Sequence, residues 1–200
     1  GLSEELDVFN AANNLPELML ASNKISADAI AFIPVLSDTL SKNGKESAWR
    51  LFSKVANLAF IVTLGLTLIV GVLAGPLVRG QLGIAPGFTP DQQTLAIRFL
   101  RLNLISTLIF SISGLVMAGL QANQHFILPA IAPLVYDVGQ IFGALILAPE
   151  QGLQIAGVTL PAFGMGIDGL VYGVIIGAAL HLLIQIPGLI KFGFKWSPIL

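Results

Sequence analysis

The strongest constraint on the fold of this chain is the run from Val55 to Val78, which contains no charged residue. At a rise of about 1.5 Å per residue, its roughly 24 residues make a helix of about 36 Å, longer than the hydrocarbon core of a bilayer. Three later segments of similar length are almost as apolar. The sequence therefore predicts a helical protein that crosses a membrane several times.

The composition agrees with this prediction and excludes an ordinary soluble domain. Of the 200 residues, 55% are hydrophobic and only 10% are charged, and the mean hydropathy is +0.86. Soluble domains carry about 25% charged residues, so this chain has too few to cover a globular surface. The net charge of −1, without any basic run, gives no indication of a nucleic-acid partner.

The sequence offers little for catalysis or for cofactors. It has no cysteine, and its two histidines, His125 and His181, are too far apart in the chain to indicate a metal centre. Neither a nucleophile in a characteristic turn nor a glycine-rich phosphate loop is present. We therefore expect no enzyme activity, cofactor or metal, and an intramembrane enzyme that uses isolated carboxyl groups is the weaker alternative.

Five membrane spans are expected, which makes this an all-α, polytopic membrane protein. Their boundaries fall near residues 5–40, 52–78, 94–120, 126–147 and 167–190. Lysine and arginine gather in the turn at 41–50 and after the last span, which predicts that these segments face the cytoplasm. The glycines of the second span, Gly65, Gly71 and Gly75, suit close contact between helices. Because the chain begins within what reads as the tail of an earlier element, we expect residues 1–200 to be a fragment of a longer protein.

Polar residues recur along the first span at the spacing of a single helical face. They are Asp7, Asn10, Asn14, Glu17, Lys24 and Asp28. In lipid, each charge at mid-bilayer costs about 2.5–3.5 kcal/mol, whereas an aliphatic residue returns only about 0.3–0.6 kcal/mol. This polar stripe therefore predicts a helix that faces a water-filled cavity or other polar groups, as helices of transporters do.

Single residues of the stripe also have a purely structural interpretation. Lys24 is close enough in sequence to form an ion pair with Glu17 or with Asp28 inside a helix bundle. Asn14 is able to form a hydrogen bond to a neighbouring helix. For the aligned stripe as a whole, the cavity interpretation is favoured.

Other polar residues within the spans are open to two interpretations. Asp137 is expected either as a buried, hydrogen-bonded group or as a cavity residue. His181 and Gln185, four residues apart on one face, are expected to join helices rather than to bind a ligand. Arg98 and Arg101 suit either a cavity or simple anchoring at the membrane surface by snorkelling.

Several short patterns follow one another in a characteristic order. They are LDVF at 6–9, LP at 15–16, AFIPV at 31–35, APGF at 85–88, LQAN at 120–123 with Phe126, Pro129-Ala130 and Pro133, and QIPGL at 185–189. None is specific alone, but the ordered set resembles the lipid II flippase family (MurJ/MviN) of the multidrug/oligosaccharidyl-lipid/polysaccharide exporter superfamily. The resemblance covers nearly the whole chain and implies the second through sixth helices of a two-lobe transporter fold.

The resemblance also implies a function and two site positions. The expected activity is transport of an undecaprenyl-pyrophosphate-linked peptidoglycan precursor across the bacterial cytoplasmic (inner) membrane, by alternating access between two lobes. Asp7 matches an acidic position of the family that faces the central cavity, and Arg101 matches a basic position near the start of the fourth helix. Together with the polar stripe and Asp137, they are the expected substrate-cavity residues.

This chain departs from the family pattern at several positions near the stripe. The departures are Leu20 and Ala21 in place of two arginines, Ile25 in place of a glutamate, Glu17 in place of an asparagine, and His125 in place of an arginine. Arginines suit an anionic pyrophosphate because the guanidinium group binds phosphate with two parallel hydrogen bonds. Lys24 is the only cation on the stripe. The resemblance therefore supports the fold more strongly than it supports lipid II as the transported molecule.

The leading hypothesis is a flippase for lipid II. A cation-coupled multidrug exporter and a flippase for another polyprenyl-linked glycan are the alternatives within the superfamily. A membrane subunit that acts as a scaffold without transport is the alternative from another class. The expected partners are the lipid-linked oligosaccharide, membrane lipids and, for coupled transport, a cation.

Overall fold

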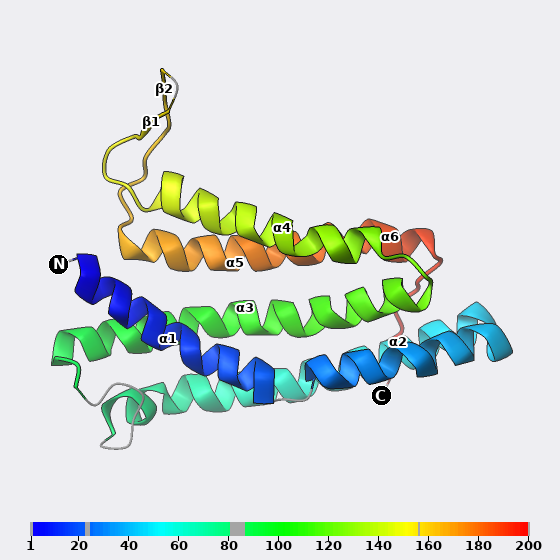
Figure 1. Cartoon of the computed structure of the whole chain (residues 1–200). Helices are drawn as coiled ribbons and strands as arrows, with labels where there is room; N and C mark the ends of the chain where they lie inside the picture. The colour runs from blue at the N-terminus through cyan, green and yellow to red at the C-terminus, as the bar shows by residue number, and fades with distance from the viewer. Residues whose placement is uncertain (1, 23–24, 81–86, 156, 200) are drawn as a thin grey trace.

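The structure is a computed structural model that describes residues 2–22, 25–80, 87–155 and 157–199, with side chains placed in 4–14, 31–80, 87–154 and 157–199. Helices make up nearly all of its regular structure (Figure 1). The elements are α1 (Leu2–Ser22), α2 (Ile25–Arg79), α3 (Pro90–Ala122), α4 (Ile127–Phe142), the π-helical turn η1 (Gly143–Leu147), β1 (Gln154–Ile155), β2 (Val158–Thr159), α5 (Ile167–Leu183) and α6 (Ile186–Lys191). The short β1–β2 hairpin projects from one end of the long helices.

Four helical stretches among the described residues are long and apolar enough to cross a membrane. They are Ala31–Arg79, Pro90–Ala122, Ile127–Leu147 and Ile167–Lys191. The expected all-α, polytopic membrane fold is thereby confirmed. The first expected span, residues 5–40, stays a prediction, because it includes residues 15–30, whose side chains are not placed, and residues 23 and 24 lie outside the described part of the chain.

The helix α2 folds back on itself at a single residue. Gly44 has a φ of 81° and a ψ of 173°, a conformation that a residue with a Cβ rarely adopts. The helical segments on either side lie side by side, so that the ring of Phe32 meets the ring of Phe52 with centroids 6.3 Å apart (Figure 1). The turn expected over residues 41–50 is therefore confined to Gly44, and helix continues on both sides of it.

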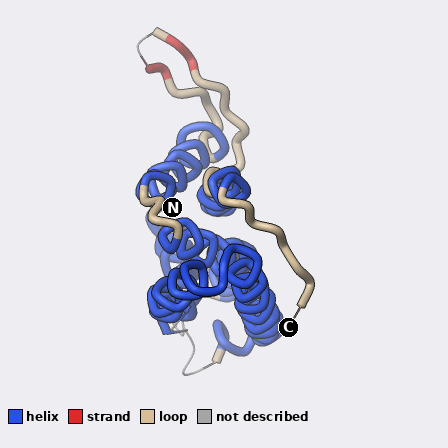
Figure 2. Tube along the Cα trace, turned by 90° about the vertical axis from the view of Figure 1, so that its right-hand side faces the viewer, coloured by secondary structure: helices blue, strands red, loops and turns tan. Residues whose placement is uncertain are grey.

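The helix α3 lies at the centre of the bundle. It packs against α1, α2, α4, α5 and α6, and its buried residues point in every direction around its axis. Figure 2 shows the long helices nearly end-on, with the extended tail that follows α6 (residues 192–199) running down one side. Two apolar clusters form around α3, one including Val8, Ala12, Phe99, Leu100 and Val171, and the other including Trp49, Phe52, Leu115, Leu120 and Leu189.

The closest helix contact joins α4, η1 and α5, and it depends on glycine. A Cβ at Gly143 would lie 2.6 Å from the carbonyl oxygen of Gly169 and 2.6 Å from the Cα of Gly173. A Cβ at Gly139 would collide with the backbone of Gly177. The expectation for the second span is wrong for two of its glycines, because a Cβ at Gly65 or Gly75 would meet nothing within 4 Å.

Two outer faces of the bundle are apolar and exposed, as a surface in contact with lipid should be. The second half of α2 exposes large side chains, among them Leu68 at 61% and Val72 at 76%. The helix α4 does the same with Leu134 at 63% and Val138 at 58%. In their side-chain chemistry these faces suit contact with the hydrocarbon of a membrane.

Candidate transport site

The described part of the polar stripe occupies one exposed face of α1. Asp7, Asn10 and Asn14 are exposed, and their spacing of three and four residues places them on the same side of the helix. The opposite side carries Val8 and Ala12, which are 0% and 5% exposed within the first apolar cluster. The helix α1 is thus held to the bundle by its apolar side and presents its polar side outward.

This outward face differs in chemistry from the other exposed faces of the bundle. The exposed faces of α4 and of residues 55–78 in α2 carry mainly Leu, Ile, Val and Phe, with Asp137 as the one charged residue exposed on α4. The face of α1 carries one carboxylate and two amides at Asp7, Asn10 and Asn14. Amides both donate and accept hydrogen bonds, and a carboxylate accepts them. The α1 face is therefore suited to water or to a polar, hydroxyl-rich ligand and unsuited to lipid.

The other three residues of the stripe fall partly or wholly outside the described residues. Glu17 belongs to α1 and Asp28 to α2, but their side chains are among those not placed. Lys24 lies outside the described residues. The ion pairs expected between Lys24 and the two carboxylates therefore stay predictions.

A pair of asparagines fixes α1 to α3. The side-chain Nδ2 of Asn103, which is 3% exposed, donates a hydrogen bond to Oδ1 of Asn13. One turn away, the rings of Phe9 and Phe99 meet edge to face with centroids 6.5 Å apart. The hydrogen bond between helices that was considered for Asn14 is thus made by its neighbour Asn13, which leaves Asn14 exposed.

Arg101 lies on the side of α3 that faces away from α1. It is two positions from both Phe99 and Asn103, so its side chain points about 160–200° away from theirs around the helix. Its Nε donates to the carbonyl oxygen of Gly71 on α2 at 3.0 Å. The structure therefore does not bring Arg101 together with the polar face of α1.

Arg101 instead shares a cavity with two other arginines. The cavity measures about 490 Å³ and is lined by Arg79 of α2, Arg98 and Arg101 of α3, and Tyr172 of α5 among others. Arg98 is also 2.8 Å from the carboxylate of Asp168 at the start of α5. This ion pair between α3 and α5 was not expected from the sequence, because 70 residues separate its partners.

Asp137 stands apart from both groups. It is exposed on α4, between Leu134, Val138 and Ile141, which are exposed on the same face. Within the described residues, no hydrogen bond or ion pair of its carboxylate is found. The structure places Asp137 on a different helix face from the stripe and does not bury it.

His181 and Gln185 join helices, in agreement with their structural interpretation. The Oγ of Ser113 on α3 lies 2.6 Å from Nδ1 of His181 and accepts from Nε2 of Gln185 at 3.0 Å. All three residues are buried, and Gln185 is 0% exposed. Ser113 is the member of this group that the sequence did not indicate.

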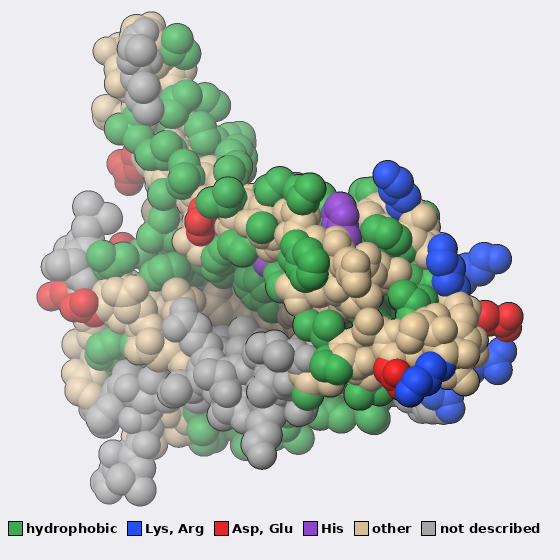
Figure 3. Space-filling view, turned by 45° about the vertical axis from the view of Figure 1, so that its right-hand side comes forward, with side chains coloured by type: hydrophobic (Ala, Val, Ile, Leu, Met, Phe, Trp, Pro, Cys, Tyr) green, Lys and Arg blue, Asp and Glu red, His purple; other side chains and the backbone are tan. Residues whose placement is uncertain are grey.

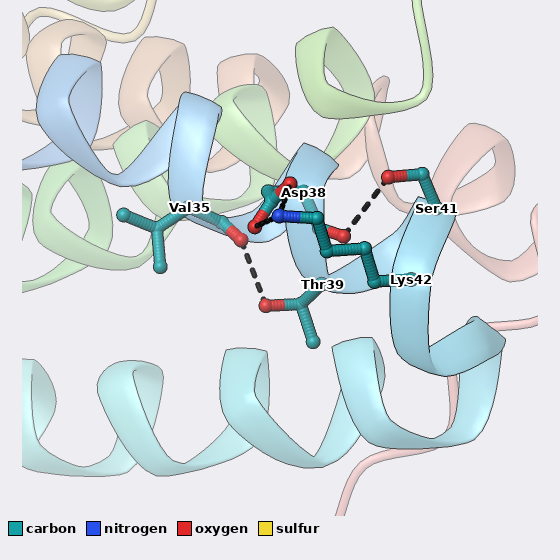
Figure 4. Close-up of polar contacts among 5 residues, drawn as sticks. All are labelled: Val35, Asp38, Thr39, Ser41 and Lys42. Carbon is teal, nitrogen blue, oxygen red and sulfur yellow. Dashed lines mark hydrogen bonds and ion pairs between the residues drawn. The ribbon is translucent and has the colours of Figure 1, made fainter.

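The cations expected on the cytoplasmic side gather at one end of the molecule (Figure 3). That end carries the Gly44 bend, α6 and the tail, whose basic residues are Lys42, Lys45, Arg50, Lys54, Lys191 and Lys195. At the bend, the ammonium group of Lys42 lies 2.9 Å from the carboxylate of Asp38, and the hydroxyls of Thr39 and Ser41 donate to backbone carbonyls (Figure 4). These contacts are exposed and local to one helix.

The described residues contain no group of three or more side chains that suits a metal ion. What they do contain is a helix with a polar outward face, an apolar inward face and a hydrogen-bonded anchor to the centre of the bundle. Such a helix can present hydrogen-bonding groups at membrane depth to a ligand without exposing them to lipid.

Comparison with known proteins identifies relatives over the whole chain. The family described as lipid II flippase MurJ matches residues 1–200. The lipid II flippase MurJ of Burkholderia cenocepacia is 26% identical over 193 residues, which are 96% of this chain and 34% of the relative. The probable lipid II flippase MurJ of Synechocystis is 30% identical over 162 residues, covering 81% of this chain and 30% of the relative.

A third relative leads to the same assignment. The probable lipid II flippase MurJ of Buchnera aphidicola is 26% identical over 207 aligned residues, which cover 100% of this chain and 38% of the relative. The chain thus spans about a third of the length of the curated relatives it matches. Because the family matches every residue from 1 to 200, the chain belongs to the lipid II flippase MurJ family.

Proposed function

We propose that this chain forms part of the first lobe of a flippase that carries a lipid-linked peptidoglycan precursor across the bacterial inner membrane. The names of the relatives support the class of cargo, since all three are described as lipid II flippases or probable ones. The apolar spans support the location in a membrane. Transport by alternating access requires a second lobe, which lies outside residues 1–200.

The observation that carries the proposal is the polar outward face of α1. Asp7, Asn10 and Asn14 are exposed side by side, whereas α4 and the second half of α2 expose mainly aliphatic and aromatic side chains. A charged group at mid-bilayer costs about 2.5–3.5 kcal/mol, so this face is stable only against water or a polar partner. A central cavity between two lobes supplies such a surrounding.

In this proposal the residues divide into those that meet the cargo and those that hold the helix. Asp7, Asn10 and Asn14 hydrogen-bond to the sugar and peptide of the headgroup. Lys24 attracts the pyrophosphate as the cation of the stripe. Arg101, which bonds to α2 on the far side of α3, acts in packing rather than in contact with the cargo.

The test is complementation of a bacterium depleted of its own lipid II flippase, using the full-length gene that contains this chain. The wild-type gene is expected to restore growth, and Asp7→Ala and Lys24→Ala to reduce or abolish it at equal protein level. Glu150→Ala, which removes an exposed carboxylate from the loop before β1, is the control expected to leave growth unchanged.

Two outcomes contradict the proposal in different ways. Failure of the wild-type protein to restore growth while it is inserted and folded argues against lipid II as the cargo. If the Asp7→Ala and Lys24→Ala variants both restore growth, the flippase activity is supported, but Asp7 and Lys24 are not part of its binding site. Ion-dependent efflux of a dye from vesicles is the result that would favour the multidrug exporter.

A further inference from the structure

Two cavities adjoin each other at the basic end of the molecule, on the far side of the bundle from α1. The first measures about 510 Å³ and is polar; it is lined by Lys45, Glu46, Trp49, Arg50, Gly193, Lys195 and Ser197. The second measures about 390 Å³ and is lined by mostly apolar residues that include Phe52, Phe60, Ile112, Val116, Phe194 and Trp196. The same segment of the tail lines both cavities.

The tail separates the two cavities by the alternation of its side chains. Lys195 and Ser197 line the polar cavity, whereas Phe194 and Trp196 line the apolar one. The ring of Phe194 packs against those of Trp49 and Phe52, with centroids 5.6 and 5.2 Å apart. A cluster of three aromatic rings therefore lies between the polar and the apolar space.

The tail is held in this position by hydrogen bonds to α2. The Nδ2 of Asn57 donates to the carbonyl oxygens of Ser197 and Ile199 at 2.9 and 2.8 Å, and its Oδ1 accepts from Nε1 of Trp196 at 3.0 Å. The backbone N–H of Ser197 donates to Oγ of Ser53 at 3.1 Å. The paired cavities are therefore a fixed feature of the fold and do not depend on a loose chain end.

The polar cavity carries an excess of positive charge. Arg50 lies 3.3 Å from Glu46, which compensates one cation. Lys45 and Lys195 have no ion pair among the described residues. The indole N–H of Trp49, a residue only 3% exposed, has no hydrogen-bond acceptor within the described part of the chain. This cavity therefore offers two uncompensated ammonium groups to an anion, whereas the N–H of Trp49 is enclosed in its wall.

The apolar cavity is bordered by exposed apolar side chains, among them Ile190 and Trp196, which suit contact with lipid. Ile112 and Val116 lie 13 and 17 positions after Phe99, which faces α1, so their directions differ from that of Phe99 by about 140° and 100° around α3. No residue of α1 lines either cavity. Neither cavity is therefore shared with the polar face of α1.

We propose that the paired cavities bind an anionic glycerophospholipid of the cytoplasmic leaflet. Its headgroup phosphate lies among Lys45, Arg50 and Lys195, and one acyl chain fills the apolar cavity beside Phe194 and Trp196. Basic pockets between spanning helices on the cytoplasmic side attract anionic lipid headgroups in this way. The lipid adds a further connection between the bend of α2 and the tail, beside the hydrogen bonds of Ser53 and Asn57 and the ring contacts of Phe194.

The test is native mass spectrometry of the full-length protein in detergent, titrated with phosphatidylglycerol or with phosphatidylcholine of the same acyl chains. We expect phosphatidylglycerol to be retained at least several-fold more strongly. Lys45→Gln combined with Lys195→Gln should weaken its retention roughly tenfold and leave phosphatidylcholine unchanged. Equal retention of the two lipids by the wild-type protein would overturn the proposal.

A matched control separates this site from a general attraction to a basic surface. Lys42→Gln combined with Lys191→Gln removes two cations from the same end, but neither residue lines either cavity. This control is expected to retain phosphatidylglycerol like the wild-type protein. An equal loss in both double variants would show that the end as a whole, and not the cavity, attracts the lipid.

The apolar cavity is tested by filling it and by cross-linking. Ala56→Phe places a ring in this space and should weaken phosphatidylglycerol retention in protein whose thermal unfolding is unchanged. Phosphatidylglycerol with a photoreactive acyl chain should cross-link to residues 52–60 and 186–196. Cross-links confined to α4, or displacement of the lipid by soluble glycerol phosphate alone, would contradict binding of the acyl chain.

Discussion

Asn103 of α3 donates a hydrogen bond from its side chain to the side chain of Asn13 on α1, across 90 positions of sequence. Through this contact the central helix of the bundle fixes the rotation of α1 about its own axis. Because Asn13 points inward, its neighbours Asn10 and Asn14 lie on the exposed side. The position of the proposed cargo-binding face therefore depends on a residue that does not belong to it.

Asn13→Ala is predicted to lower the stability of the folded protein by about 1–2 kcal/mol, since it leaves the buried amide of Asn103 without its partner. Asn10→Ala, three residues away and exposed, is the matched control and is predicted to leave stability unchanged. Thermal unfolding of the purified proteins in one detergent measures both. Equal stability of the two variants would show that the asparagine pair does not anchor α1.

Gly143→Ala is predicted to destabilise the packing of η1 on α5 by about 1–3 kcal/mol. Its new methyl group would lie 2.6 Å from backbone atoms of Gly169 and Gly173, which cannot move aside as a flexible side chain could. Gly114→Ala in α3 adds the same methyl group where nothing lies within 4 Å. The prediction fails if the two alanine variants unfold at the same temperature.

Ser113→Ala is predicted to cost about 1–3 kcal/mol because it leaves His181 and Gln185, both buried, without their shared partner. Ser111→Ala is the matched control, since the Ser111 hydroxyl bonds only to the carbonyl of Leu108 within its own helix. Chemical unfolding followed by helical circular dichroism compares them. A larger loss in Ser111→Ala would contradict the proposed link between α3 and α5.

The ion pair between Arg98 and Asp168 is predicted to contribute only about 0–1 kcal/mol, because Arg98 is 54% exposed and solvent screens the charges. A double-mutant cycle with Arg98→Gln and Asp168→Asn gives the coupling energy, and added salt should reduce it. A coupling well above this range that is insensitive to salt would indicate that the pair is shielded from water.

The sequence predicted the helical membrane fold well, but the ends of its elements only in part. Thr89-Pro90-Asp91-Gln92 is a capping box, in which Thr89 and Gln92 bond to each other's backbone, and α3 accordingly begins at Pro90. The prediction began this span at residue 94 because it followed hydropathy instead of capping.

Contacts between distant segments were beyond what the sequence could predict. Small residues suggested close packing at Gly65 and Gly75, yet the contact is made by Gly143 and Gly173. The face on which a helix meets its neighbour depends on how the bundle assembles, and the periodicity of a single helix carries no information about that assembly.

The candidate site was predicted in part for the same reason. The spacing of Asp7, Asn10 and Asn14 is a property of a single helix, and the structure does place them on one exposed face. The location of Arg101 is a property of three helices, because α1 and α2 meet α3 on different sides. Its place opposite α1 could not be read from the residues around it.

The most direct test is whether water reaches the outward face of α1 within the membrane. The chain has no cysteine, so Asn10→Cys in a cysteine-free full-length protein reacts at one site only. We predict that a membrane-impermeant thiol reagent labels Asn10→Cys in intact cells, and that Val138→Cys on the apolar face of α4 reacts only with a permeant reagent. Labelling of Val138→Cys but not of Asn10→Cys by the impermeant reagent would show that the polar face of α1 does not line an aqueous cavity.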